Sequence, residues 1–193
     1  MTKTETASEC FSRAISLNKK GDKDGAIVAY RLCVEEIDPK YTDAWYNLGI
    51  MLMNHKTDIA GAEYAYKKAL EITPKDTDIW YNLGILLEDK NDISGAEHAY
   101  KKALEIAPEY ADAWNNLGLL LMNHQKDITE AEAAYKKALK FDPKNAIVWY
   151  NWGVLLMDHK KDFASAEIAY KKALKIDPKF AYAKNNLRLI LKK

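Results

Sequence analysis

The sequence predicts an all-α protein, a solenoid in which one helical hairpin recurs along the chain. Two observations predict it. The only five prolines are separated by 35, 34, 35 and 35 residues, and four tryptophans keep gaps of 35, 34 and 35. A fixed period of this length indicates a stack of near-identical supersecondary units. The residues concerned are Pro39, Pro74, Pro108, Pro143 and Pro178, and Trp45, Trp80, Trp114 and Trp149.

The unit that ends at Pro108 shows why each repeat is expected to be a helical hairpin. Apolar residues recur at three- and four-residue steps in both of its halves, which is helical spacing. Asp92 is expected to cap the second helix at its start, and Pro108 prevents continuation into the next unit. Gly84 and Ala96 are small because the two helices approach closely there, and Tyr100 is expected to fill the space beside them.

The repeated positions resemble the tetratricopeptide repeat (TPR) family. The Trp, Leu, Gly, Ala, aromatic, Ala and Pro positions of that family are occupied here by Trp80, Leu83, Gly84, Ala96, Tyr100, Ala103 and Pro108. Three other units repeat them, with Trp152 in place of Leu in the fifth, and the first unit is degenerate. The resemblance implies a right-handed superhelical α-solenoid of five hairpins, concave on the side of the first helices.

The resemblance covers almost the whole chain, and we expect a single domain of residues 1–193. Its repeat units are expected at about 7–40, 42–75, 77–109, 111–144 and 146–179, and a capping helix at about 180–192. Arg188 stands in the glycine position of that last helix and would block a close-packed partner, so this helix should end the array. One extra residue lies in the interhelical turn of the second, fourth and fifth units, and before Pro39 in the first. The shapes of these turns are left open.

Composition and motifs argue against catalysis, nucleic acid and membranes. The chain has 29 basic and 28 acidic residues, a net charge of +1, and no long apolar stretch or signal-peptide core. We therefore expect a cytoplasmic protein without nucleic-acid or membrane partners. No phosphate-binding loop or nucleophile motif is present, so no enzyme and no cofactor is predicted. His55, His124 and His159 occupy matching turns, about 10 Å apart by helix packing, which is too far for a shared metal.

Two cysteines, Cys10 and Cys33, replace the Trp and second Ala positions of the first unit. These positions face each other across a TPR hairpin, so a disulfide is conceivable. Two buried thiols that act as small hydrophobic side chains are the favoured reading in a reducing compartment.

TPR proteins usually bind peptides in the concave groove formed by their first helices. Helical steps counted from each Trp give the expected partner-binding residues, which are Tyr46, Asn47, Ile50, Met53, Asp78, Tyr81, Asn82, Ile85, Asn115, Asn116, Leu119, Met122, Tyr150, Asn151, Val154 and Met157.

Three features of this groove suggest what it binds. An apolar stripe that includes Ile50, Ile85, Leu119 and Val154 would hold apolar anchors, unless neighbouring repeats shield it. A column of asparagines either clamps a peptide backbone or serves the scaffold; its members are Asn47, Asn82, Asn116, Asn151 and Asn186. Acidic residues along the edge favour basic flanks and argue against the acidic chaperone tails that other TPR proteins bind; they are Asp43, Asp78, Glu88, Asp89, Asp112 and Asp158.

The leading interpretation is a non-enzymatic scaffold that binds a protein or peptide segment in this groove. The alternative is a self-assembly module in which the groove or an end pairs with another copy. An RNA-binding repeat protein is a third reading, which the TPR positions and the near-zero net charge disfavour. The paired lysines of the second helices are interpreted as a solvated face, because a glutamate precedes each pair by four residues.

Overall fold

The computed structural model describes residues 5–56, 58–125 and 127–192, and every regular element in these ranges is helical. The predicted all-α class is thereby confirmed. The chain divides into two compact units, Met1–Ala99 and Tyr100–Lys193, which are described separately. The boundary falls inside helix α6 (Ile93–Ile106). The count of five hairpins, their boundaries and the single domain of residues 1–193 stay predictions.

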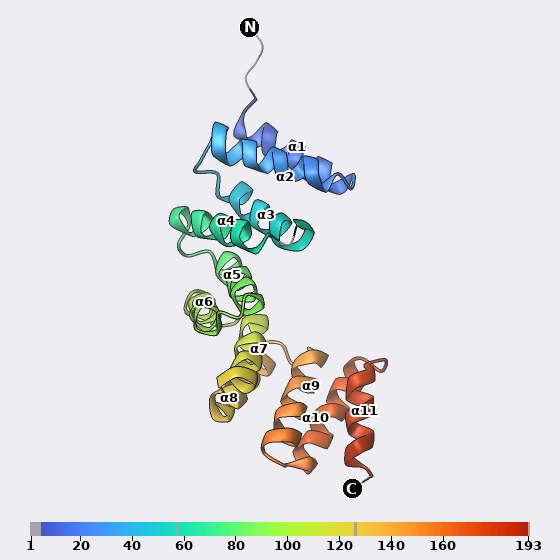
Figure 1. Cartoon of the computed structure of the whole chain (residues 1–193). Helices are drawn as coiled ribbons and strands as arrows, with labels where there is room; N and C mark the ends of the chain where they lie inside the picture. Colours follow the sequence, from blue (N-terminus) through green and yellow to red (C-terminus); the bar gives the residue numbers. More distant parts are fainter. Residues whose placement is uncertain (1–4, 57, 126, 193) are drawn as a thin grey trace. The chain divides into compact units, whose positions relative to one another are not determined.

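The first unit consists of helices packed as successive pairs (Figure 1). Helix α1 packs against α2 and α3 packs against α4, and α5 follows α4. Two of these helices are each followed by a π-helical turn (η), and α6 begins in this unit. The elements are α1 (Ala7–Lys19), α2 (Lys23–Leu32), η1 (Cys33–Ile37), α3 (Thr42–Met51), η2 (Leu52–Lys56), α4 (Ile59–Ile72) and α5 (Thr77–Asp89).

The second unit repeats this arrangement. Helix α7 packs against α8 and α9 packs against α10, while α11 lies on α10 without a second helix of its own in the described residues (Figure 1). The elements are α7 (Ala111–Leu120), η3 (Leu121–Gln125), α8 (Ile128–Phe141), α9 (Ala146–Val154), η4 (Leu155–His159), α10 (Phe163–Ile176) and α11 (Ala181–Ile190).

An aspartate begins the second helix of every hairpin. The Oδ1 atom of Asp92 accepts a hydrogen bond from the Gly95 N–H at 3.0 Å, as the sequence predicted. Such a side-chain cap contributes about 1 kcal/mol to helix stability. The same bond is made by Asp22, Asp58, Asp127 and Asp162.

A hydrogen bond from tryptophan to proline explains why the two residues share one period. The Nε1–H of Trp114 donates to the carbonyl oxygen of Pro108, six residues earlier, at 2.8 Å. The same bond joins Trp45 to Pro39, Trp80 to Pro74 and Trp149 to Pro143, at 2.9 to 3.0 Å. The indole therefore fastens each first helix to the turn that precedes it.

The close approach predicted at the repeated glycine is present in both units. A Cβ atom on Gly49 would lie 2.6 Å from the ring of Tyr66, and one on Gly118 would lie 2.9 Å from the ring of Tyr135. Both tyrosines are fully buried, so their rings have no free space into which to move. The first repeat carries a buried alanine, Ala14, at this position.

The extra residues in the interhelical turns and before Pro39, whose conformation the sequence did not predict, are accommodated as π-helical turns. Turns η2, η3 and η4 end the first helices of the three units that have a longer interhelical turn, and η1 lies just before Pro39. The hairpin of α5 and α6, the one unit with a 34-residue spacing, has no such turn in its described residues. A residue inserted at the end of a helix widens its last turn rather than displacing the next helix.

The two cysteines lie in the core of the first hairpin as free thiols with no exposed surface. The Sγ of Cys10 donates to the carbonyl oxygen of Ala29 at 3.2 Å. Burial raises the pKa of Cys33 to about 12 and also raises the pKa of Cys10. Both therefore behave as small buried side chains in this structure.

Candidate peptide-binding face

The predicted binding residues lie on one side of the first helices, α3 and α5 in the first unit and α7 and α9 in the second. We call this side the first-helix face. Asp78 is exposed, and most of the others are half-buried. Those half-buried are Tyr46, Asn47, Ile50, Met53, Tyr81, Asn82, Ile85, Asn115, Asn116, Leu119, Tyr150, Asn151, Val154 and Met157.

Met122 differs from the other predicted residues. Its side chain is only 5% exposed, whereas Met53 and Met157 are half-buried. It lies within turn η3 and contributes to the core there, so it offers no open surface to a ligand. The apolar stripe of Ile50 and Ile85 is likewise only partly exposed. Contacts within the repeats therefore shield some, though not all, of the apolar surface that the sequence suggested.

The asparagine column joins neighbouring first helices in the first unit. The Nδ2 of Asn82 on α5 donates to the hydroxyl of Tyr46 on α3 at 3.1 Å and to the carbonyl oxygen of Asp78 at 2.8 Å. In the preceding repeat, Asn47 makes only the second kind of bond, to Asp43. The amide hydrogens of Asn82 thus serve the scaffold.

The second unit uses its asparagines in the same way. The Nδ2 of Asn151 on α9 donates to the Oδ1 of Asn115 on α7 at 3.0 Å, and Asn186 on α11 donates to the hydroxyl of Tyr170 at 3.2 Å. Within the described residues, the side-chain oxygens of Asn82 and Asn151 accept no bond. The donors therefore fasten adjacent helices, while these two acceptors stay available on the face.

Carboxylates line the edge of the first-helix face. Asp43 and Asp89 in the first unit, and Asp112 and Asp158 in the second, are exposed. Their side chains make no hydrogen bond or ion pair in the described part of the chain. Burial, together with the charges of Asp78 and Asp76, raises the pKa of Tyr46. A cationic group of a ligand would thus find carboxylates not already neutralised by the protein.

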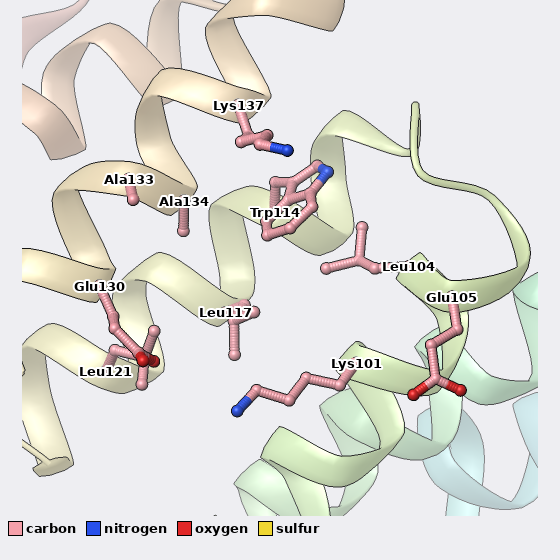
Figure 2. Close-up of a pocket in the computed structure, with 10 residues that line it drawn as sticks. All are labelled: Lys101, Leu104, Glu105, Trp114, Leu117, Leu121, Glu130, Ala133, Ala134 and Lys137. Atoms are coloured by element: carbon pink, nitrogen blue, oxygen red, sulfur yellow. The ribbon is translucent and has the colours of Figure 1, made fainter.

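Sequence reasoning missed a second kind of surface, on the outer side of the repeats. Successive outer helices enclose apolar clefts over the tryptophans, with volumes of about 570 Å³ at Trp45, 540 Å³ at Trp80 and 510 Å³ at Trp114. Figure 2 shows the cleft at Trp114. The signal in the sequence is the residue expected to cover each indole, which changes in every repeat: Tyr64, His98, Ala133 and Ile168.

The histidines do not form a metal site in the described residues. His55 lies 3.2 Å from the carboxylate of Asp24, and His98 packs edge-on against Trp80 with ring centroids 5.9 Å apart. No cluster of three or more His, Cys, Asp or Glu side chains occurs in the part of the chain that the structure describes. None of its helices there has the length and apolar character that crossing a bilayer requires.

Comparison with known proteins agrees with this architecture. The chain resembles the crystal structure of the MamA protein, with 26% identity, 92% of this chain and 94% of MamA covered, and a TM-score of 0.80. YrrB, a TPR protein described as having an unusual peptide-binding site, gives 24% identity, coverage of 96% and 94%, and a TM-score of 0.78. PilF of Pseudomonas aeruginosa gives 20% identity, with 96% of this chain and 83% of PilF covered, and a TM-score of 0.82. The last two likenesses show the fold alone.

No curated protein matches the chain by sequence. The family model described as tetratricopeptide repeat matches residues 81–146 and 127–179, together more than half of the chain. This family consists of non-catalytic scaffolds that generally mediate protein–protein interactions. The matched segments contain the Trp, Gly, Ala, Tyr and Pro positions whose contacts are described above. The chain belongs to the tetratricopeptide repeat family.

Proposed function

We propose that this protein is a non-enzymatic scaffold that binds a peptide or partner segment on its first-helix face. The ligand carries apolar anchors and basic flanks. Membership of a family of interaction scaffolds supports the general role. The observation that carries the specific proposal is the combination, in each unit, of an unused amide oxygen, a half-buried apolar column and unpaired carboxylates at the edge.

Each group has a distinct task in this proposal. The Oδ1 of Asn82 accepts a backbone N–H of an extended ligand, a contact that does not depend on the ligand's sequence. Ile50 and Ile85 receive an apolar side chain, and its burial supplies most of the affinity, about 25 cal/mol per Å² of apolar surface. Asp43 and Asp89 attract a lysine or arginine beside that anchor, which favours basic ligands and speeds association.

Peptide arrays with matched variants test this proposal. The array presents one apolar anchor flanked by Lys and Arg, or by Glu, or by Gln. We expect the basic-flanked peptides to bind best, and Ile50→Ala with Ile85→Ala to weaken them at least about tenfold by removing apolar contact surface. Val28→Ala is the control, because Val28 is an aliphatic side chain on the outer helix α2, 66% exposed.

The result that refutes the proposal is equally specific. Equal loss of binding in the Val28→Ala variant would place the ligand outside the first-helix face. Stronger binding of the Glu-flanked peptides would contradict the role of the edge carboxylates. Far-ultraviolet circular dichroism of each variant separates loss of binding from loss of helical structure.

A further inference from the structure

The cleft at Trp114 lies on the side of α7 opposite its first-helix face. Trp114 and Leu117 on α7, and Leu121 at the start of η3, fall on one side, roughly half a turn from Asn115, Asn116 and Leu119. Helices α6 and α8 form the two walls. A ligand here would therefore leave the first-helix face untouched.

The outer-helix residue beside this half-buried indole differs from those at the same place in α4 and α6. Tyr64 packs edge-on against Trp45 with ring centroids 5.7 Å apart, and His98 covers Trp80 in the same manner. Ala133 takes the corresponding place in α8 and has no side chain long enough to reach Trp114. The ammonium of Lys137 lies over the ring, 5.3 Å from its centroid, on a flexible stem that can swing aside.

Four charged residues surround the cleft, and two of them are unpaired. Glu105 accepts a hydrogen bond from Lys102 at 2.6 Å, and Lys101 is engaged by another residue. Lys137 has no carboxylate partner, and the side chain of Glu130 makes no hydrogen bond or ion pair, within the described residues. Figure 2 shows Glu130 beside Leu121 and Lys137 beside Trp114, at different ends of the cleft.

The cleft at Trp80, in the first unit, has no such unpaired charges among its described residues. Glu63 is held by Lys67 at 2.6 Å and by Lys90 at 2.8 Å. Glu71 is held by Lys68 at 2.7 Å, and Asp92 caps helix α6. Among the rim residues that the structure describes there, every charged side chain thus has a partner inside the protein. The Trp80 cleft therefore serves as an internal comparison for the Trp114 cleft.

The position three residues after Lys137 strengthens the contrast. In α4 and α6 that position is glutamate, and it forms the Lys68–Glu71 and Lys102–Glu105 pairs. In α8 it is Lys140, so a like charge replaces the partner of Lys137. Like charges at this spacing destabilise a helix slightly. Helix α10 carries Lys175 at the same place, so α8 and α10 both lack this pair, and in α8 the ammonium groups of Lys137 and Lys140 lie over the rings of Trp114 and Phe141 instead.

We propose that the Trp114 cleft docks one helix of a partner protein. The partner inserts an apolar side chain against Trp114 and Leu117, places an acidic residue near Lys137 and a basic residue near Glu130. Glu130 and Lys137 are seven residues apart on α8, a rise of about 10 Å, so the partner's two charges stand about seven residues apart with the anchor between them. This is helix-in-groove recognition.

The rim charges exclude the two other candidate ligands. A nucleic acid carries phosphates throughout, and Glu130 would repel them. A second copy of this chain would offer an exposed outer residue such as Ile168, but Lys171 and Lys172 lie close behind it and would meet Lys137. The mixed charge of the rim instead suits a helix with one charge of each sign.

The probe for this proposal is a synthetic helical peptide, stapled on its back face, with Glu, Leu and Lys at positions i, i+3 and i+7. Its binding is followed by nuclear magnetic resonance of the alanine methyl groups and indole N–H groups of the full chain. We expect shifts at Ala133 and Trp114 but not at Trp80. Leu→Ala in the peptide should weaken binding at least about tenfold, because it removes the apolar anchor.

Charge exchange on the protein gives the decisive comparison. Lys137→Glu makes both of the unpaired rim charges acidic and should shift preference to a peptide with two lysines. Glu130→Lys should shift preference to a peptide with two glutamates. Each exchange should change affinity about two- to fivefold. Ala133→Tyr, which introduces the residue found over Trp45, should abolish binding while the helical content is kept.

Four results would overturn the proposal. They are no shift at Ala133 with any of the peptides, the same charge preference in wild type and Lys137→Glu, larger shifts at Ala133 with oligothymidine than with the peptide, and a light-scattering dimer that Ala133→Tyr dissociates. None of them bears on the first-helix face, whose ligand is tested separately.

Discussion

The close packing of glycine against tyrosine gives a quantitative prediction for Gly49→Ala. The added Cβ would lie 2.6 and 2.7 Å from two ring carbons of Tyr66, about 1 Å inside ordinary van der Waals contact. Tyr66 is fully buried, so the overlap must be relieved by moving the helices, at about 1–3 kcal/mol. Alanine recovers about 1 kcal/mol through its higher helix propensity. We expect a net loss of up to about 2 kcal/mol.

Gly118→Ala is the matched variant. Its Cβ would lie 2.9 Å from the ring of Tyr135, so the overlap is smaller and the propensity gain offsets most of it. We expect a change in unfolding free energy of less than about 1 kcal/mol. Ala14→Gly, at the position where the first repeat already accommodates a buried methyl group, should destabilise by about 1–2 kcal/mol, through lower helix propensity and loss of that buried methyl group.

Urea unfolding followed by circular dichroism measures all three variants, with the slope of the transition checked for each. If Gly49→Ala and Gly118→Ala are stabilised equally, helix propensity dominates and the tyrosine ring does not limit the approach of the two helices. Gly49→Ala more stable than wild type would refute the packing argument outright.

Three further predictions follow from individual contacts. Trp114→Phe should lower the free energy of unfolding in urea by about 1 kcal/mol, because it removes the hydrogen bond to Pro108. Trp152→Phe should lower it by less, because the buried Nε1–H of Trp152 has no partner in the described residues. Equal losses of stability in the two variants would contradict the role of the hydrogen bond to Pro108. Hydrogen bonds from Lys67 and Lys90 hold the pKa of Glu63 below 4.5, so the stability that Glu63 contributes is present above that pH and is lost as the pH falls through the lowered pKa. The difference in melting temperature between wild type and Glu63→Gln should therefore shrink on acidification. A difference that stays constant with pH would exclude this linkage. Burial raises the pKa of Cys33 to about 12, so iodoacetamide at pH 8 should label neither cysteine until the chain is unfolded in guanidinium, and rapid labelling of the native chain would disprove their burial.

The periodic part of this fold could be predicted from the sequence because each position has one dominant task. Glycine at position 49 and tyrosine at position 66 recur together since they contact each other, and aspartate at position 92 recurs because it caps a helix. The π-helical turns could not be predicted. An extra residue can lengthen a loop or widen a helical turn, and local contacts decide between the two.

The candidate sites were predictable to different degrees. Helical spacing indicated which residues share one side of the first helices. It did not show that the side-chain amides of Asn82 and Asn151 donate hydrogen bonds to neighbouring helices. Nor did it show that Met122 would be buried. The cleft at Trp114 was not predicted because an alanine such as Ala133 is common on the solvent-exposed side of a helix and does not by itself indicate a cleft. Its significance comes from the cleft that it forms with Trp114, which is a tertiary feature.

Mapping a bound ligand on the protein tests the proposed function most directly. The measurement is isoleucine and valine methyl resonance shifts on addition of a basic-flanked peptide with one apolar anchor. We predict shifts at Ile50 and Ile85 on the first-helix face, with Val28, Ile168 and Ile176 on the outer helices unchanged. Shifts confined to the outer helices would contradict it.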